Sequence, residues 1–148
     1  MRLSPAMVRT SVAFTIHQSF REIASLYDGF MLDQYGVMHN GKHPLPGAVE
    51  CVRYLASNGK KLVVLSNTSS PSRSALQRLS ELGFDEDYFV GVVTSGDEAA
   101  RYISSTYGRT DPSQKKMKGL WFTWKDGKTP RPRDFLEMCG DIEATDGQ

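Results

Sequence analysis

FMLDQYG, residues 30–36, is the stretch that decides the fold of this 148-residue chain. Its apolar start, Phe30 to Leu32, predicts a buried strand that ends at Asp33. A second apolar run, Leu62 to Leu65, predicts another buried strand, and Ser66-Asn67 follows it directly. A right-handed crossover makes two such strands parallel, so Asp33 and Ser66 are expected at the same carboxyl edge of the sheet. Open α/β sheets bind their ligands at that edge.

Helical patterns follow both predicted strands. Apolar residues at three- and four-residue spacing predict a helix that has Pro46 in its first turn and ends near Gly59. A second stripe of this kind starts at Ala75 and stops at Gly83. Residues 29–82 therefore alternate between strand and helix, which indicates a parallel sheet.

A third strand and helix are predicted further along the chain. Residues 89–93 have the apolar, β-branched composition of a strand, and Thr94 or Ser95 is suited to cap a helix over residues 96–107. Asp97 lies in the first turn of that helix, where a carboxylate stabilises the helix dipole, so we expect it to be structural. The fold class is thus predicted as α/β, with a partial Rossmann-like parallel sheet and helices on both faces.

The chain is expected to have three parts. Residues 1–26 are predicted to be an N-terminal segment with an amphipathic helix from about residue 14, and residues 27–108 the core. Residues 109–148 are less regular and predict the beginning of a cap domain or an irregular tail. Within this last part, residues 120–124 predict a strand and residues 135–138 a short helix.

Composition excludes several classes of protein. The chain is 39% hydrophobic and 24% charged, and its formal net charge is +1, which leaves no basic surface for nucleic acid. No apolar run approaches the roughly 20 residues that span a bilayer, so no membrane segment is expected. Cys51 and Cys139 lack the spacing of a zinc site or disulfide framework.

The expected location is the cytoplasm, because the two isolated cysteines are compatible with a reducing compartment. An alternative is a mitochondrion or plastid. The first 21 residues hold three arginines, five Ser or Thr and no acidic residue, a composition similar to that of a transit peptide.

The segment that follows Asp33 is predicted to form a small flap. Residues 34–46 contain two glycines and two prolines, and the Asn40-Gly41 pair favours a tight turn. His39 precedes this pair. A lone histidine in a flap is usually a polar surface residue, and we expect that here rather than a metal ligand.

Asp33 is the residue best placed for chemistry. A carboxylate at the end of a strand can act as a nucleophile when nearby backbone amides hold an anion. Aspartate at such a place is otherwise a cap that binds adjacent backbone amides. Ser66 and Asn67 favour the catalytic interpretation, because a hydroxyl and an amide beside Asp33 can grip a phosphoryl oxygen.

These residues, together with stretches further along the chain, resemble the haloacid dehalogenase-like hydrolase superfamily. The similar stretches are residues 31–37, Gly41, residues 45–48, residues 65–69 and residues 94–100. Within that superfamily they are most similar to subfamily IIA, which includes the sugar-phosphate and 4-nitrophenyl phosphate hydrolases.

The resemblance implies a phosphatase that acts on a small phosphorylated metabolite. It implies that Asp33 forms an aspartyl-phosphate and that Asp33 and the Tyr35 carbonyl hold Mg²⁺. The residues that it implies for phosphate binding are Gly36, Ser66, Asn67 and Thr68.

Tyr35 departs from the pattern of these phosphatases, which carry a second aspartate at this position as a general acid and base. A phenol with a pKa of about 10 is a poor proton donor to a leaving alkoxide at neutral pH. Asp33-x-Tyr35-Gly36 also resembles the first motif of the 2-haloacid dehalogenases, in which halide leaves without a proton. Dehalogenation is therefore an alternative reaction, in which Tyr35 remains near the site.

The family completes its site with a downstream lysine and a pair of aspartates, and the chain is expected to end before them. Asp141 and Asp146 imitate the spacing of that pair, but Glu137 interrupts the preceding apolar run, so we expect a chance match. A third alternative is therefore a non-catalytic fragment or pseudoenzyme that binds a ligand. The incomplete sheet is also expected to expose an edge and to favour self-association.

Overall fold

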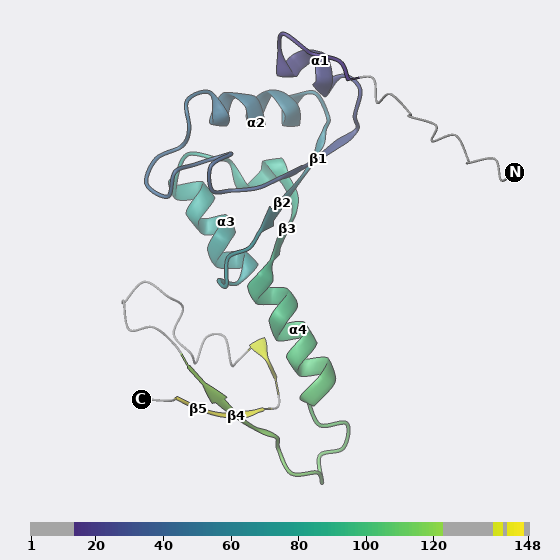
Figure 1. Ribbon diagram of the computed structural model, residues 1–148, viewed down its shortest axis with the longest axis vertical. Helices are drawn as coiled ribbons and strands as arrows, with labels where there is room; N and C mark the ends of the chain where they lie inside the picture. The colour runs from purple at the N-terminus through teal and green to yellow at the C-terminus, as the bar shows by residue number, and fades with distance from the viewer. Residues whose placement is uncertain (1–13, 123–137, 141, 147–148) are drawn as a thin grey trace, which may run out of the picture.

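The computed structural model describes residues 14–122, 138–140 and 142–146. Its helices and strands follow one another along the chain as α1 (Phe20–Ala24), β1 (Gly29–Leu32), α2 (Ala48–Ser57), β2 (Lys61–Ser66), α3 (Ser72–Glu81), η1 (Glu86–Tyr88), β3 (Phe89–Thr94), α4 (Ser95–Tyr107), β4 (Lys118–Trp121) and β5 (Glu143–Asp146). The alternation predicted from the sequence for residues 29–107 is confirmed (Figure 1).

Strands β1, β2 and β3 form one parallel sheet in the order β1-β2-β3. Met31 pairs with Val63, and Ser66 pairs with Thr94. Because all three strands run in the same direction, the residues that follow β1 and β2 emerge at the same edge of the sheet. The predicted placement of Asp33 near Ser66 rests on this arrangement.

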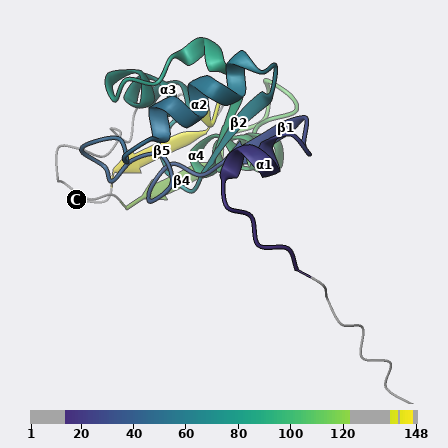
Figure 2. The same cartoon turned by 90° about the horizontal axis from the view of Figure 1, so that it is seen from above.

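One face of the sheet carries the core. Leu62 and Val64 of β2 are completely buried, and they pack with Val52 and Leu55 of α2 and with Leu79 of α3. Figure 2 shows α2 and α3 together on the same side of the strands. Both crossovers proceed in the same direction along the sheet, so a right-handed connection places both helices on that side.

The opposite face is uncovered by any of the described helices, which corrects the expectation of helices on both faces. Met31, Leu65 and Val93 are 77%, 49% and 37% exposed, respectively. They share this face because Met31 pairs with Val63, Leu65 pairs with Val93, and side chains alternate along a strand. The prediction of a buried strand at residues 30–32 is also wrong in part, because the residues of β1 alternate between exposed and half-buried.

Two predicted helix ends differ from the structure. The N-terminal helix starts at Phe20 rather than near residue 14, because the Ser19 hydroxyl accepts a hydrogen bond from the Arg21 N–H and caps it. Pro46 lies before α2 instead of in its first turn. Gly47 has φ 78° and is the N-cap, so the chain turns at this glycine before the helix begins.

The last described part of the chain forms a second small sheet. Helix α4 begins where β3 ends and leads away from the first sheet (Figure 1), and Ala100 on this helix packs against Cys139. Strand β4 overlaps the predicted strand at residues 120–124 and pairs in parallel with β5, which the sequence did not predict. Most of the predicted helix at residues 135–138 lies outside the described residues.

Among the described helices, none combines the length and the apolar composition needed to cross a bilayer. Residues 1–13, most of the transit-like segment, lie outside the described part of the chain.

Candidate active site

Asp33 is the first residue after β1 and is exposed at the carboxyl edge of the sheet. Its Oδ1 accepts a hydrogen bond of 2.7 Å from the Gln34 N–H. This contact fixes one carboxylate oxygen against the backbone and leaves Oδ2 available to a ligand. Both interpretations of Asp33 from the sequence, as backbone cap and as nucleophile, are therefore compatible with its position.

Ser66 and the two residues after it form a turn at the end of β2. The Ser66 hydroxyl accepts a long contact of 3.4 Å from the Thr68 N–H, and the Thr68 hydroxyl accepts one of 3.2 Å from the Ser70 N–H. These short-range contacts turn the chain back toward α3. Ser66 is buried, whereas Asn67 is exposed.

The start of α4 holds this turn in place. The Gly96 N–H donates to the Thr68 carbonyl at 3.1 Å, and the two Asp97 carboxylate oxygens accept from the Ser72 N–H at 3.2 and 3.1 Å. The Thr94 hydroxyl caps the helix by accepting from the Asp97 N–H. The structural role predicted for Asp97 is thus confirmed, and it extends to α3, because Ser72 begins that helix.

Gly96→Ala is expected to lower the free energy of unfolding by about 1–3 kcal/mol. A Cβ at this position would lie 2.3 Å from the Ser69 carbonyl oxygen, which belongs to the backbone and cannot rotate away. Urea unfolding followed by circular dichroism measures the effect. Gly91→Ala in β3 is the matched control, since a Cβ there meets no atom within 4 Å. Equal stability of the two variants would contradict the prediction.

The flap predicted for residues 34–46 is present. The Asn40 Oδ1 accepts from the Lys42 and His43 N–H groups at 3.0 and 2.8 Å, and Gly41 has φ 90°. The Gly36 N–H donates to the His39 carbonyl at 2.8 Å. The flap itself therefore uses the Gly36 amide, which is not free to bind phosphate in this conformation.

A cavity of about 270 Å³ lies between the flap, the end of β2 and α3. Its lining residues are Gln34, Tyr35, His39, Ser66, Asn67, Thr68, Ser70, Ser74, Ala75 and Arg78. Four of the predicted site residues therefore line the same cavity: Tyr35, Ser66, Asn67 and Thr68. Asp33 and Gly36 do not line the cavity, although both are chain neighbours of residues that do.

His39 is the site residue for which the prediction from the sequence was wrong. The prediction of a surface histidine is incorrect, because His39 is 7% exposed and lines the cavity. Its Nδ1 accepts a hydrogen bond of 3.0 Å from the Gly41 N–H, and its ring stands edge-on to that of Tyr35. Burial and the nearby Arg78 cation lower the pKa of His39, an effect that the Asp33 carboxylate opposes. No periodic pattern marks a buried position in a flap, so the sequence carried no signal for it.

Arg78 ties α3 to the flap. One guanidinium nitrogen donates to the Gly41 carbonyl at 2.8 Å, and the other pairs with Glu81 at 2.8 Å. The same side chain lines the cavity. Arg78 thus brings a positive charge to a wall that is otherwise neutral.

The oxygen atoms present fit the implied Mg²⁺. This ion prefers hard oxygen ligands, and proteins often hold it with one or two carboxylates, leaving further positions to water and phosphate. Asp33 Oδ2 and the Tyr35 carbonyl are oxygens of this kind. Within the described residues, no group of three or more His, Cys, Asp or Glu could hold a metal. Asp146 lies in β5, and Asp141 lies outside the described residues.

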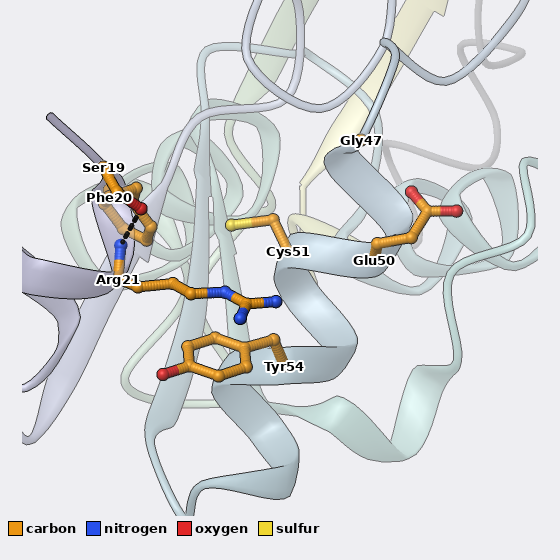
Figure 3. Close-up of a pocket in the computed structure, with 7 residues that line it drawn as sticks. All are labelled: Ser19, Phe20, Arg21, Gly47, Glu50, Cys51 and Tyr54. Carbon is orange, nitrogen blue, oxygen red and sulfur yellow. Dashed lines mark hydrogen bonds between the residues drawn. The ribbon is translucent and has the colours of Figure 1, made fainter.

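A second cavity of about 270 Å³ lies between α1 and α2 and shares no residue with the first (Figure 3). The Arg21 guanidinium lies over the Tyr54 ring at 4.8 Å from its centre. Cys51 faces this cavity, and burial raises the pKa of its thiol, which makes the reactive thiolate scarcer. The contacts here attach α1 to the core and offer no arrangement for catalysis.

Comparison with known proteins identifies the family of the part of the chain that contains the first cavity. A family model described as haloacid dehalogenase-like hydrolase matches residues 30–120. A 4-nitrophenylphosphatase of Schizosaccharomyces pombe is 31% identical over 157 aligned residues, which cover 86% of this chain and 52% of that protein. Human glycerol-3-phosphate phosphatase is 40% identical over 58 residues, covering 38% of this chain and 18% of that protein.

A solved structure supports the fold independently. The haloacid dehalogenase-like hydrolase of Brucella suis 1330 superposes with a TM-score of 0.64 at 18% sequence identity. The match covers 88% of this chain and 42% of that one. The chain thus spans about half the length of the 4-nitrophenylphosphatase and less than half of the solved hydrolase.

Proposed function

Because this chain belongs to the haloacid dehalogenase-like hydrolases, subfamily IIA, we propose that it hydrolyses a small phosphate ester through an aspartyl-phosphate on Asp33. The observation that carries the proposal is the Asp33 carboxylate, held by one oxygen and free at the other, at the sheet edge where Ser66 and Asn67 emerge. The curated relatives named as phosphatases support the same substrate class.

In the proposed reaction, Asp33 Oδ2 attacks phosphorus while the bond from phosphorus to the leaving oxygen breaks. The Ser66 hydroxyl and the Asn67 amide donate hydrogen bonds to the phosphoryl oxygens as negative charge builds on them. Water then hydrolyses the aspartyl-phosphate, which releases phosphate and regenerates the carboxylate. Mg²⁺, held by Asp33 and the Tyr35 carbonyl, would neutralise charge on the phosphoryl group.

The choice of leaving group follows from Tyr35. A neutral phenol protonates an alkoxide poorly at neutral pH, so esters whose leaving group departs as a stable anion are favoured. Aryl phosphates such as 4-nitrophenyl phosphate meet this condition. They are therefore the substrates on which activity is expected first.

Phosphate release from 4-nitrophenyl phosphate, measured with Mg²⁺ and with a chelator, tests the proposal. Asp33→Asn protein from the same preparation serves as the blank for contaminating phosphatases. Release that needs both Mg²⁺ and Asp33 supports the proposed function. No release above the blank favours the third interpretation, a protein that binds a phosphorylated ligand without turning it over.

Dehalogenation is the second candidate, and Tyr35 favours it. The Tyr35 ring is 71% exposed and lies at the cavity, where an aromatic side chain can pack beside a departing halide. In this case Asp33 would attack carbon, and no proton donor would be needed. Halide release from a 2-haloacid in the presence of a chelator, without phosphate release from an aryl ester, would select this reaction.

We also propose that the chain self-associates through its uncovered sheet face. Parallel sheets are normally covered on both faces, and the face that carries Met31, Leu65 and Val93 is apolar and exposed. A hydrophobic face of this kind favours concentration-dependent association.

Leu65→Lys is expected to shift the chain toward monomer at any given concentration, because a lysine at the middle of this face must lose its hydration when the face is covered. Sedimentation velocity over a range of concentrations measures the shift. Tyr102→Lys, an exposed position on α4 outside this sheet, is a control for added charge. A parent chain that stays monomeric at the highest concentration would contradict the proposal.

A further inference from the structure

Two polar nitrogens on the cavity wall are buried without a hydrogen-bond partner among the residues that the structure describes. They are His39 Nε2 and Gln34 Nε2, and each of these residues is 7% exposed. Nearly all buried polar groups in folded proteins are hydrogen-bonded, so unpaired ones require an explanation. An unsatisfied buried polar group destabilises the folded chain, and two of them line one cavity here.

The contacts of His39 identify its free nitrogen as a donor. Nδ1 accepts a hydrogen bond from the Gly41 N–H, so Nδ1 carries the lone pair. The proton of the neutral ring must then lie on Nε2. The flap thereby selects the tautomer that presents an N–H group to the cavity, and Gln34 adds an amide N–H beside it.

The other residues that line the cavity indicate the charge of a ligand that would pair with these two nitrogens. They include the Arg78 guanidinium, which also pairs with Glu81 outside the lining, three serine hydroxyls, Thr68 and the Asn67 amide, but none of the residues that line this cavity carries a carboxylate. N–H and O–H donors around a single positive charge bind an oxyanion, whereas a metal cation would lack acceptors with negative charge.

We propose that His39 and Gln34 form the inner wall of an oxyanion subsite, where their N–H groups bind oxygen atoms of a phosphate group. This inference rests on the proposed function, since it assigns to the phosphate ester that Asp33 attacks both His39, which lies outside the recognised motifs, and the side chain of Gln34, which lies in the first of them. Ser66 and Thr68 contribute hydroxyl donors to the same cavity, and Arg78 adds charge. His39 acts as a neutral donor in this role and exchanges no proton with the substrate.

Tyr35 lies beside this subsite. The two nitrogens are almost inaccessible to solvent, and the Tyr35 ring stands edge-on to His39 with 6.4 Å between the ring centres. The Tyr35 side chain is 71% exposed, so it loses little packing when it swings outward. Outward rotation of this exposed side chain would widen the approach to the two nitrogens without any change in the sheet.

Binding of inorganic phosphate to the full chain, followed by NMR of ¹⁵N-labelled histidine, tests the subsite without turnover. The ring of His39 is expected in the Nε2–H tautomer, and its Nε2 proton is expected to shift downfield as phosphate is added. Loss of a hydrogen bond to a charged oxygen corresponds to roughly a tenfold or greater loss of affinity.

Two substitutions separate the role of each ring nitrogen. His39→Asn keeps an acceptor near Nδ1 for the Gly41 N–H but removes the deep donor, so phosphate affinity is expected to fall about tenfold or more. His39→Gln places an amide N–H near Nε2, and its affinity is expected to stay within about threefold of the parent. Gln34→Met, which keeps the side-chain length, is expected to weaken binding in the same direction as His39→Asn. Amide spectra of each variant confirm that the chain remains folded.

The outcomes also separate this inference from the proposed function. Phosphate binding that depends on His39, without any Asp33-dependent hydrolysis, would support the subsite and contradict the proposed phosphatase activity. Asp33-dependent hydrolysis with unchanged phosphate affinity in folded His39→Asn would overturn the subsite alone. The Nδ1–H tautomer, or a parent chain that does not bind phosphate, would overturn the subsite as well.

Discussion

Asp33→Asn is expected to abolish phosphate release, with a loss on the order of 10⁴-fold or more, as is typical when a covalent nucleophile is removed. The amide has no anionic oxygen to attack phosphorus. The fold is expected to survive, because the asparagine Oδ1 can still accept the hydrogen bond of 2.7 Å from the Gln34 N–H. The loss would therefore report on chemistry and not on structure.

Initial rates with 4-nitrophenyl phosphate and Mg²⁺ measure this effect, and thermal unfolding confirms equal stability. Asp28→Asn is the matched control, since Asp28 is an exposed aspartate at the opposite end of β1 and loses the same charge. Its activity is expected to equal that of the parent. Phosphate release that persists in Asp33→Asn would remove Asp33 from the mechanism and with it the phosphatase assignment.

The position of Asp33 could be predicted because it depends on local patterns. An apolar run predicts the strand, and the polar residue that follows it predicts where the carboxyl edge of the sheet lies. The right-handed crossover predicts that the next strand runs parallel to the first. The same reasoning placed Ser66 at that edge and offered Thr94 or Ser95 as the cap of the next helix, of which the structure uses Thr94. These features need only a few consecutive residues, so they can be read without knowledge of distant contacts.

His39 and the uncovered sheet face could not be predicted in this way. His39 is buried where α3 meets the flap, and the hydrogen bond from Arg78 to the Gly41 carbonyl joins segments 37 residues apart in the sequence. The exposure of Leu65 likewise depends on which side of the sheet the helices occupy. An apolar strand has the same composition whether one or both of its faces are covered, so the pattern of residues 62–65 left this open.

Tyr35→Asp is expected to raise the hydrolysis of alkyl phosphates by roughly 10²-fold, at the lower end of the usual contribution of a general acid. A carboxyl group here could protonate the leaving alkoxide and then activate water against the aspartyl-phosphate. Tyr35 is 71% exposed and its ring stands edge-on to that of His39, so its replacement is expected to cost little stability.

The comparison of two substrates makes this prediction specific. Hydrolysis of 4-nitrophenyl phosphate gains less from Tyr35→Asp, because its leaving group departs without a proton, so the ratio of alkyl to aryl activity should rise. Tyr35→Phe removes the hydroxyl but keeps the ring, and its rates are expected to match those of the parent on both substrates. A large loss in Tyr35→Phe would show that the phenol itself takes part in the reaction. An unchanged ratio in Tyr35→Asp would mean that protonation of the leaving group does not limit this site.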